Sequence, residues 1–170
     1  MSSIKILLAV ESNQLITYWR QKKLKSNPVS KGTIMGNNRA PNRELLDRIL
    51  YAEDDMDIQE LVSLALTMIG NFTLKICNSG LEAVNEVEAF DPQLLLLDVM
   101  MPFLDGPGAL KKIRKMEAFK EIPVVFLTAK VQGPEVRAYL RMPDVAVISK
   151  PFDPLTLADQ ITEFWANLDN

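Results

Sequence analysis

The segment Leu94–Gly106 has the sequence LLLLDVMMPFLDG. Four consecutive leucines lead directly into one acid, Asp98, and turn-forming residues follow it. An apolar run of this length, bounded by turn signals, is typical of a strand buried on both faces of a parallel sheet. Asp98 is then the last residue of that strand, at the edge where open α/β sheets bind ligands. Two interpretations stay open here: Asp98 belongs to a functional site, or it caps the following loop or helix.

Around this segment, residues 46–168 alternate between strand and helix patterns five times. The predicted strands are Arg48–Ala52, Phe72–Cys77, Leu94–Asp98, Pro123–Thr128 and Val145–Ser149. The predicted helices are Asp57–Ile69, Ser79–Phe90, Gly108–Met116, Pro134–Met142 and a last helix that Asp153 and Pro154 open. Such alternation implies right-handed crossovers and a parallel sheet. The fold class is therefore α/β.

Helical spacing also predicts which side chains of two helices face the core. In the first helix they are Ile58, Leu61, Val62, Ala65 and Ile69, and in the last helix they are Leu157, Ile161, Phe164 and Leu168. Gly70 is expected to end the first helix, and either Asn78 or Ser79 is expected to cap the second.

The composition narrows the chemistry available to the chain. The 170 residues are 48% hydrophobic and 24% charged, as in globular proteins. The single cysteine, Cys77, allows no internal disulfide and fits a reducing compartment, so we expect a cytoplasmic protein. The chain has no histidine, which excludes imidazole bases and histidine-ligated metals. Any chemistry must use carboxylates, lysine, threonine or serine.

Charge is distributed unevenly along the chain. Residues 1–45 carry eight lysines and arginines against two acids, whereas the remaining residues carry 11 against 20. The main domain is therefore acidic, and we do not expect it to bind nucleic acid directly. No apolar run approaches the roughly 20 residues that a membrane span needs. The short run at Ile4–Val10 lacks a clear cleavage site, so a signal peptide is not expected.

The basic N-terminal part divides into two segments. In residues 1–26, apolar side chains recur at roughly helical spacing before a basic end, which favours a helix over a short strand. Such a helix packs on the domain or a partner; contact with an anionic membrane surface is the alternative. Residues 27–45 are rich in Pro, Gly, Asn and Ser and are interpreted as a linker. One domain, residues 46–170, follows.

Polar residues collect where the predicted strands end. They are Glu53, Asp54 and Asp55 after the first strand, Asp98 on the third, Thr128 on the fourth and Lys150 after the fifth. Carboxylates this close together need a cation, and Mg²⁺ is the hard ion that carboxylates, water and phosphate oxygens bind. Lys150 and Thr128 could then clamp a phosphoryl group, with Asp98 as the nucleophile of an acyl phosphate. Each residue also has a structural alternative: helix-capping acids, a structural threonine and a solvated lysine.

Four motifs in order resemble the receiver domain of two-component response regulators: YAEDD, LLLLDVMMPFLDG, VVFLTAK and VISKPFDP. The resemblance covers about residues 47–168. It implies a CheY-like, flavodoxin-like fold, which is a doubly wound five-stranded parallel sheet with strand order 2-1-3-4-5. It also implies that Asp98 accepts a phosphoryl group from a histidine kinase or a phosphotransfer protein.

The resemblance assigns roles to the other motif residues. Glu53 and Asp54 would hold Mg²⁺ together with Asp98 and the backbone carbonyl of Met100. The family pattern favours this pair over Asp55, because its acids directly follow the apolar strand. Thr128 would be the switch hydroxyl and Lys150 the lysine that contacts the phosphoryl group. Four residues would set loop geometry around the site, with the small Ala129 leaving room for the phosphoryl group: Ala129, Pro102, Gly106 and Pro151.

Two departures from the family pattern affect the expected output. Many receivers carry Tyr or Phe three residues before the lysine, where this chain has Val147, so the aromatic rotamer switch is in doubt. Residues 143–146, PDVA, also differ from the loop common in the family, which indicates unusual signalling on that face.

Three functions remain in competition. The leading hypothesis is a single-domain response regulator, not an enzyme, that switches contacts with an unknown downstream protein or relays phosphate. The second is a receiver-like binding module that is never phosphorylated. The third is a phosphatase with an aspartate nucleophile; such enzymes commonly need a second acid two residues on, and here that position is Met100.

Overall fold

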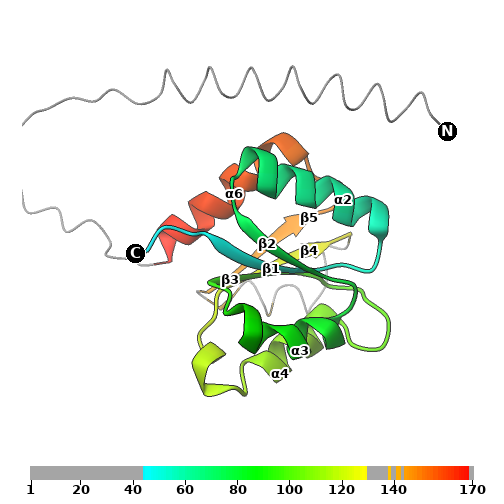
Figure 1. Ribbon diagram of the computed structural model, residues 1–170, viewed down its shortest axis with the longest axis vertical. Coiled ribbons are helices and arrows are strands. Elements are labelled where there is room, and N and C mark those ends of the chain that lie inside the picture. Colours follow the sequence, from blue (N-terminus) through cyan, green and yellow to red (C-terminus); the bar gives the residue numbers. More distant parts are fainter. Residues whose placement is uncertain (1–43, 130–137, 139–140, 143, 169–170) are drawn as a thin grey trace, which may run out of the picture. The chain divides into compact units, whose positions relative to one another are not determined.

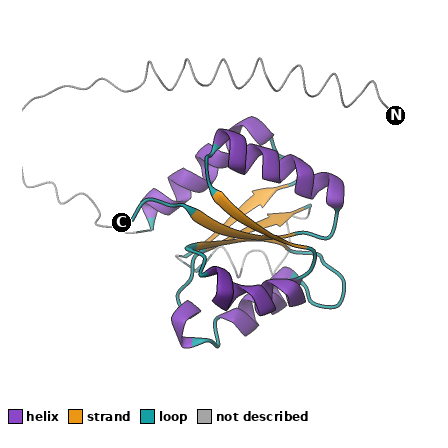
Figure 2. Ribbon diagram, in the orientation of Figure 1, coloured by secondary structure: helices purple, strands orange, loops and turns teal. Residues whose placement is uncertain are grey.

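The computed structural model describes residues 44–129, 138, 141–142 and 144–168. Their centre is a parallel five-stranded sheet with the order β2-β1-β3-β4-β5, drawn in orange in Figure 2. The strands are β1 Arg48–Ala52, β2 Thr73–Cys77, β3 Leu94–Asp98, β4 Val124–Thr128 and β5 Val145–Ser149. The predicted strand order is therefore confirmed, and β3 is the central strand.

Helices cover both faces of this sheet. They are α2 Met56–Leu64, α3 Gly80–Phe90, α4 Gly106–Ile113 and α6 Pro154–Asn167, with a π-helical turn η1 Ala65–Ile69 and a 3₁₀ turn η2 Glu117–Phe119. α2 and α6 lie on one face, and α3 and α4 lie on the other (Figure 1). This is the doubly wound, flavodoxin-like arrangement that was expected. None of the helices in the described ranges is long and apolar enough to cross a membrane.

Local capping explains most helix boundaries. Ser79 caps α3, because its hydroxyl accepts a hydrogen bond from the Glu82 backbone N–H at 3.2 Å. α4 begins two residues earlier than predicted, since Asp105 is the cap and Pro107 is tolerated in the first turn. Gly70 follows η1 as predicted, but the left-handed residue is Asn71, with φ 59°.

Some predictions fall on residues that the structure leaves undescribed. These are the extension 1–26, most of the linker 27–45 and nearly all of the helix Pro134–Met142. The division of the chain into these segments stays a prediction.

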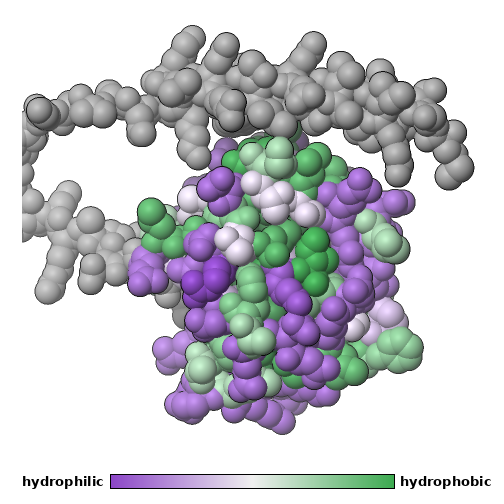
Figure 3. Space-filling view, in the orientation of Figure 1, coloured by the Kyte–Doolittle hydropathy of each residue, from purple (hydrophilic) through white to green (hydrophobic). Residues whose placement is uncertain are grey.

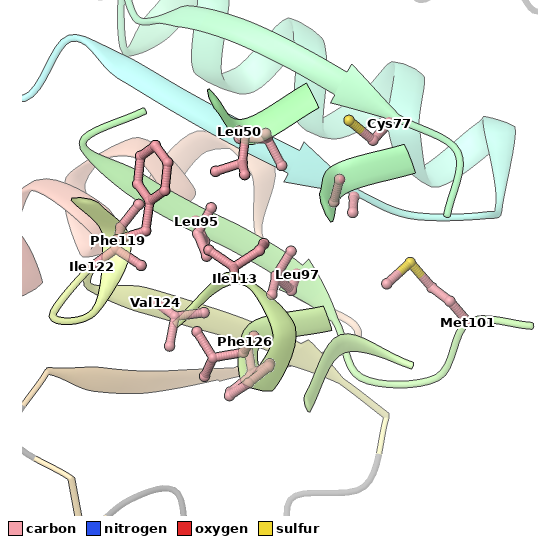
Figure 4. Packing of buried hydrophobic residues seen from close by; sticks show 14 of the residues in the cluster. Leu50, Cys77, Leu95, Leu97, Met101, Ile113, Phe119, Ile122, Val124 and Phe126 are labelled. Carbon is pink, nitrogen blue, oxygen red and sulfur yellow. The ribbon is translucent and has the colours of Figure 1, made fainter. Parts of the chain in front are cut away.

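The core consists of two apolar layers, one on each face of the sheet. Side chains alternate along a strand, so Leu95 and Leu97 of β3 point to the α3/α4 side. There they pack with Ile113 and Phe126, as Figure 4 shows. Leu94 and Leu96 point to the other layer, beneath α2 and α6. All four leucines are fully buried, as predicted for a strand covered on both faces.

The predicted core face of the first helix is only partly correct, because Ile69 is half-buried and lies outside the described core clusters. Val62 and Ala65 are buried, but Leu61 is 41% exposed, and Leu66 takes a core position instead. The buried face is centred on Val62, so Leu61 falls on the adjoining stripe of α2 and η1 with Leu64 and Met68. Figure 3 shows apolar surface gathered near this helix.

Replacing Leu96 by alanine should lower the free energy of unfolding by about 2–5 kcal/mol, because the cavity would lie in the centre of the sheet. The matched control is Leu81→Ala on α3, where the side chain is 49% exposed. It should cost no more than about 1 kcal/mol. Urea unfolding of both variants measures the difference, and equal losses would contradict the described packing.

Cys77 ends β2 and is fully buried. Burial raises the pKa of its thiol to about 12, so the reactive thiolate is scarce at pH 8. We expect a disulfide reagent to label the folded protein at least ~100-fold more slowly than the protein in guanidinium chloride. Similar rates in the two conditions would place Cys77 at the surface.

Candidate functional site

The topology gathers the predicted residues at the carboxyl edge of the sheet. Glu53 directly follows β1, Asp98 ends β3 and Thr128 ends β4. All three residues are buried, with Glu53 1% and Asp98 5% exposed. Lys150 follows β5, and its backbone N–H donates to the Thr128 carbonyl at 2.7 Å. Residues up to 97 positions apart in the sequence therefore share one site.

The ammonium group of Lys150 joins the two buried acids. Its Nζ lies 2.5 Å from Glu53 Oε2 and 2.7 Å from Asp98 Oδ1. Burial raises the pKa of Glu53, although the hydrogen bond from Lys150 opposes this. Burial lowers the pKa of Lys150, but the hydrogen bonds to Asp98 and Glu53 outweigh it, so the pKa is raised overall. Lys150 therefore stays charged at neutral pH and compensates the buried carboxylates.

Three acids are arranged so that they could hold a metal ion. Glu53, Asp54 and Asp98 each offer an oxygen, and these oxygens all lie within 4.8 Å of one another. Three carboxylates form a hard donor set that suits Mg²⁺. Asp55 is not in this group: it caps α2, accepting from the Asp57 and Ile58 backbone N–H groups at 2.9 and 3.2 Å. Asp55 is therefore the acid after β1 for which the helix-capping interpretation is correct.

The loop after Asp98 is built closely around its backbone. The Met100 N–H donates to Asp98 Oδ2 at 2.9 Å, which fixes one carboxylate oxygen. Gly106 is required at the start of α4, because a Cβ there would lie 2.2 Å from the Asp98 carbonyl oxygen. Pro102 accepts from the Leu104 N–H at 2.8 Å and so shapes the turn between them. The predicted metal contact of the Met100 carbonyl stays a prediction.

The remaining predicted residues lie beside this cluster. Ala129 is an exposed bend residue directly after Thr128, and Lys150 and Pro151 are joined by a cis peptide bond. Val147, in place of the usual aromatic residue, is half-buried in β5 and packs against the α3/α4-side core. The roles of these residues in switching stay predictions.

The unusual segment 143–146 contains a contact that the sequence did not predict. Asp144 forms an ion pair with Arg114, the residue that ends α4. Arg114 also donates to the Ile122 carbonyl at 3.0 Å. The start of β5 is therefore tied to the end of α4.

Two residues at the site were missed by sequence reasoning. The hydroxyl of Tyr51 lies 3.3 Å from Glu53 Oε2, and both groups are buried. Gln59 of α2 donates through Nε2 to the Glu53 carbonyl at 2.5 Å and to Asn78 Oδ1 at 3.0 Å. Tyr51 could have been found, since residues two apart on a strand share a face. Gln59 carried no signal, because its contacts depend on how α2 packs.

Comparison with known proteins places this arrangement in a family. Residues 49–162 match the family described as "Response regulator receiver domain". The chain is 34% identical over 125 residues to the probable transcriptional regulator ycf29 of Pyropia yezoensis, covering 70% of this chain and 53% of that protein. It is 35% identical over 117 residues to the CpxR homolog of Haemophilus influenzae, covering 68% and 49%. The chain thus spans about half the length of these relatives.

Solved structures with the same fold agree. The chemotaxis protein CheY4 of Vibrio cholerae superposes with a TM-score of 0.63 at 23% identity, over 70% of this chain and 98% of that one, which shows the fold. The receiver domain of the sensor histidine kinase PA1611 from Pseudomonas aeruginosa has a TM-score of 0.62 at 26% identity, over 71% and 97%. That structure is described with a magnesium ion coordinated in its active-site cleft.

We expect Mg²⁺ to raise the melting temperature of the protein, because a ligand that binds only the folded state stabilises it. The gain is roughly 1.4 kcal/mol for each tenfold excess over the dissociation constant. Asp54→Asn should reduce this shift, since it removes one carboxylate of the cluster. Asp57→Asn is the matched control, because Asp57 is an exposed acid outside the cluster. Thermal unfolding at several Mg²⁺ concentrations tests this, and equal shifts in both variants would contradict it.

Proposed function

The chain belongs to the family of response regulator receiver domains, and from this membership we propose that it is a phosphoryl-accepting switch. In this proposal Asp98 receives a phosphoryl group from a phosphohistidine on a histidine kinase or phosphotransfer protein. An oxygen of Asp98 supplies the electron pair for the new O–P bond. The P–N bond of the donor breaks, and its electron pair leaves with the imidazole.

The observation that supports this most directly is the setting of Asp98. Asp98 is 5% exposed, and Lys150 and the Met100 N–H already hold one carboxylate oxygen each. An acid held this firmly at a sheet edge has the fixed orientation that an attacking group needs. The Lys150 ammonium is also within reach of a phosphoryl group on that carboxylate, where it would neutralise charge.

Mg²⁺ is the cofactor of the proposal. Glu53, Asp54 and Asp98 would hold it, with the Met100 carbonyl as a further ligand. When bound, the ion supplies positive charge to the phosphoryl oxygens. Thr128, buried at the end of β4, is proposed as the hydroxyl that responds to phosphorylation.

The proposal treats the protein as a regulator and not as an enzyme with turnover. Met100 stands where an aspartate-nucleophile phosphatase would need its second acid, which disfavours that alternative. The output is proposed to be altered contact with a downstream protein, or phosphate relay. The linker-like composition of residues 27–45 supports this over a DNA-binding segment there. The cytoplasmic location stays a prediction.

Incubation with Mg²⁺ and acetyl phosphate should add one phosphoryl group to the wild-type protein and none to Asp98→Asn, which lacks the nucleophile but keeps the shape. Asp57→Asn is the control for loss of one carboxylate and should be labelled like the wild type. Intact-mass spectrometry gives the result. Adding a chelator before the donor should prevent labelling.

Two outcomes would contradict the proposal. Labelling of Asp98→Asn at another residue would remove the role of Asp98. Steady release of inorganic phosphate from small phosphate esters would favour the phosphatase instead.

A further inference from the structure

Tyr51 brings a hydroxyl group from inside the core to the acid site. Its side chain is among the largest that are fully buried in the described part of the chain. Glu53 lies two residues further along the chain, on the same side of the sheet as Tyr51. The Tyr51 hydroxyl donates to Glu53 Oε2 at 3.3 Å. Packing in the middle of a buried strand does not require a hydroxyl group. The contact of the Tyr51 hydroxyl with a buried carboxylate therefore needs another explanation.

The position of this hydroxyl is set by the core. The Tyr51 ring packs in the layer beneath α2 and α6, with neighbours that include Val62, Leu66 and Leu157. β1 is also paired on both sides, with β2 and β3. A ring in such surroundings has little freedom to move. A tyrosine hydroxyl carries its proton at neutral pH, so it can donate to the carboxylate beside it.

Glu53 needs such a donor because its other side-chain partner is shared. Lys150 contacts Glu53 and Asp98 at the same time. In the proposed function Lys150 contacts the phosphoryl group on Asp98. Among the described side-chain contacts of Glu53, the hydrogen bond from Tyr51 then remains. A glutamate has one more rotatable bond than an aspartate, so fixing its side chain in one orientation costs more conformational entropy.

We propose that Tyr51 is a positioning residue whose hydroxyl holds the Glu53 carboxylate toward the cation site that Glu53 shares with Asp54 and Asp98. The proposal rests on the proposed function in naming Mg²⁺ as the cation and in assigning Lys150 to the phosphoryl group. Groups that orient metal ligands in this way commonly change metal affinity when they are removed.

The test measures Mg²⁺ binding to the unphosphorylated full chain by isothermal titration calorimetry. Tyr51→Phe keeps the ring and deletes the hydroxyl, and it should weaken Mg²⁺ binding by about tenfold. Thr67→Val is the control. It deletes the hydroxyl of Thr67 in η1, which donates to the Ser63 carbonyl of α2 at 2.7 Å. It should bind Mg²⁺ like the wild type. Thermal unfolding without Mg²⁺ confirms that each variant is folded.

A double-mutant cycle separates positioning from a general effect on the fold. In the Glu53→Ala background, Tyr51→Phe should leave the weakened Mg²⁺ affinity unchanged, since the carboxylate on which it acts is gone. An equal loss in both backgrounds would overturn the proposal, and so would unchanged or tighter Mg²⁺ binding by Tyr51→Phe alone.

The result is independent of phosphorylation. If the wild type binds Mg²⁺ but acetyl phosphate does not label it, the proposed function fails while the role of Tyr51 is still measured. If the wild type binds no Mg²⁺, the role of Tyr51 is overturned.

Discussion

Burying negative charge at the end of a fully covered strand is the constraint on which this structure depends. β3 reaches the sheet edge through four buried leucines, and Asp98 then stands in a site that is largely closed to water. A carboxylate in such a place is costly unless an opposite charge and hydrogen bonds meet it. Lys150 supplies the charge to Asp98 and Glu53 together. The parallel direction of the strands makes this possible, because it brings their carboxyl ends to one edge.

The strands and the site could be predicted from the sequence because both follow from short-range patterns and topology. The bounds of β1, β3 and β5 are as predicted, since apolar runs in a buried sheet end sharply at polar residues. Once the sheet is parallel, the convergence of Glu53, Asp98, Thr128 and Lys150 follows from connectivity alone. The start of α4 was wrong by two residues, because Pro107 fits the first turn of a helix that Asp105 caps.

Contacts between side chains of different elements could not be predicted in this way. The Arg114–Asp144 ion pair and the bonds of Gln59 depend on the distance and rotation between packed elements. Leu61 was misplaced because helical spacing defines a stripe but not its centre, and neighbouring Val62 holds that centre. From the sequence, Asp54 could only be preferred over Asp55 as a metal ligand. The structure distinguishes the two acids, because Asp55 is the N-cap of α2.

The two ends of the short helix α4 contact different parts of the sheet. At its start Gly106 touches the Asp98 carbonyl so closely that not even a methyl group fits between them. At its end Arg114 is tied to Asp144, which directly precedes β5. Eight helical residues span about 12 Å. α4 therefore links the carboxyl edge of the sheet, where Gly106 lies against the Asp98 backbone, to the opposite edge, where β5 begins.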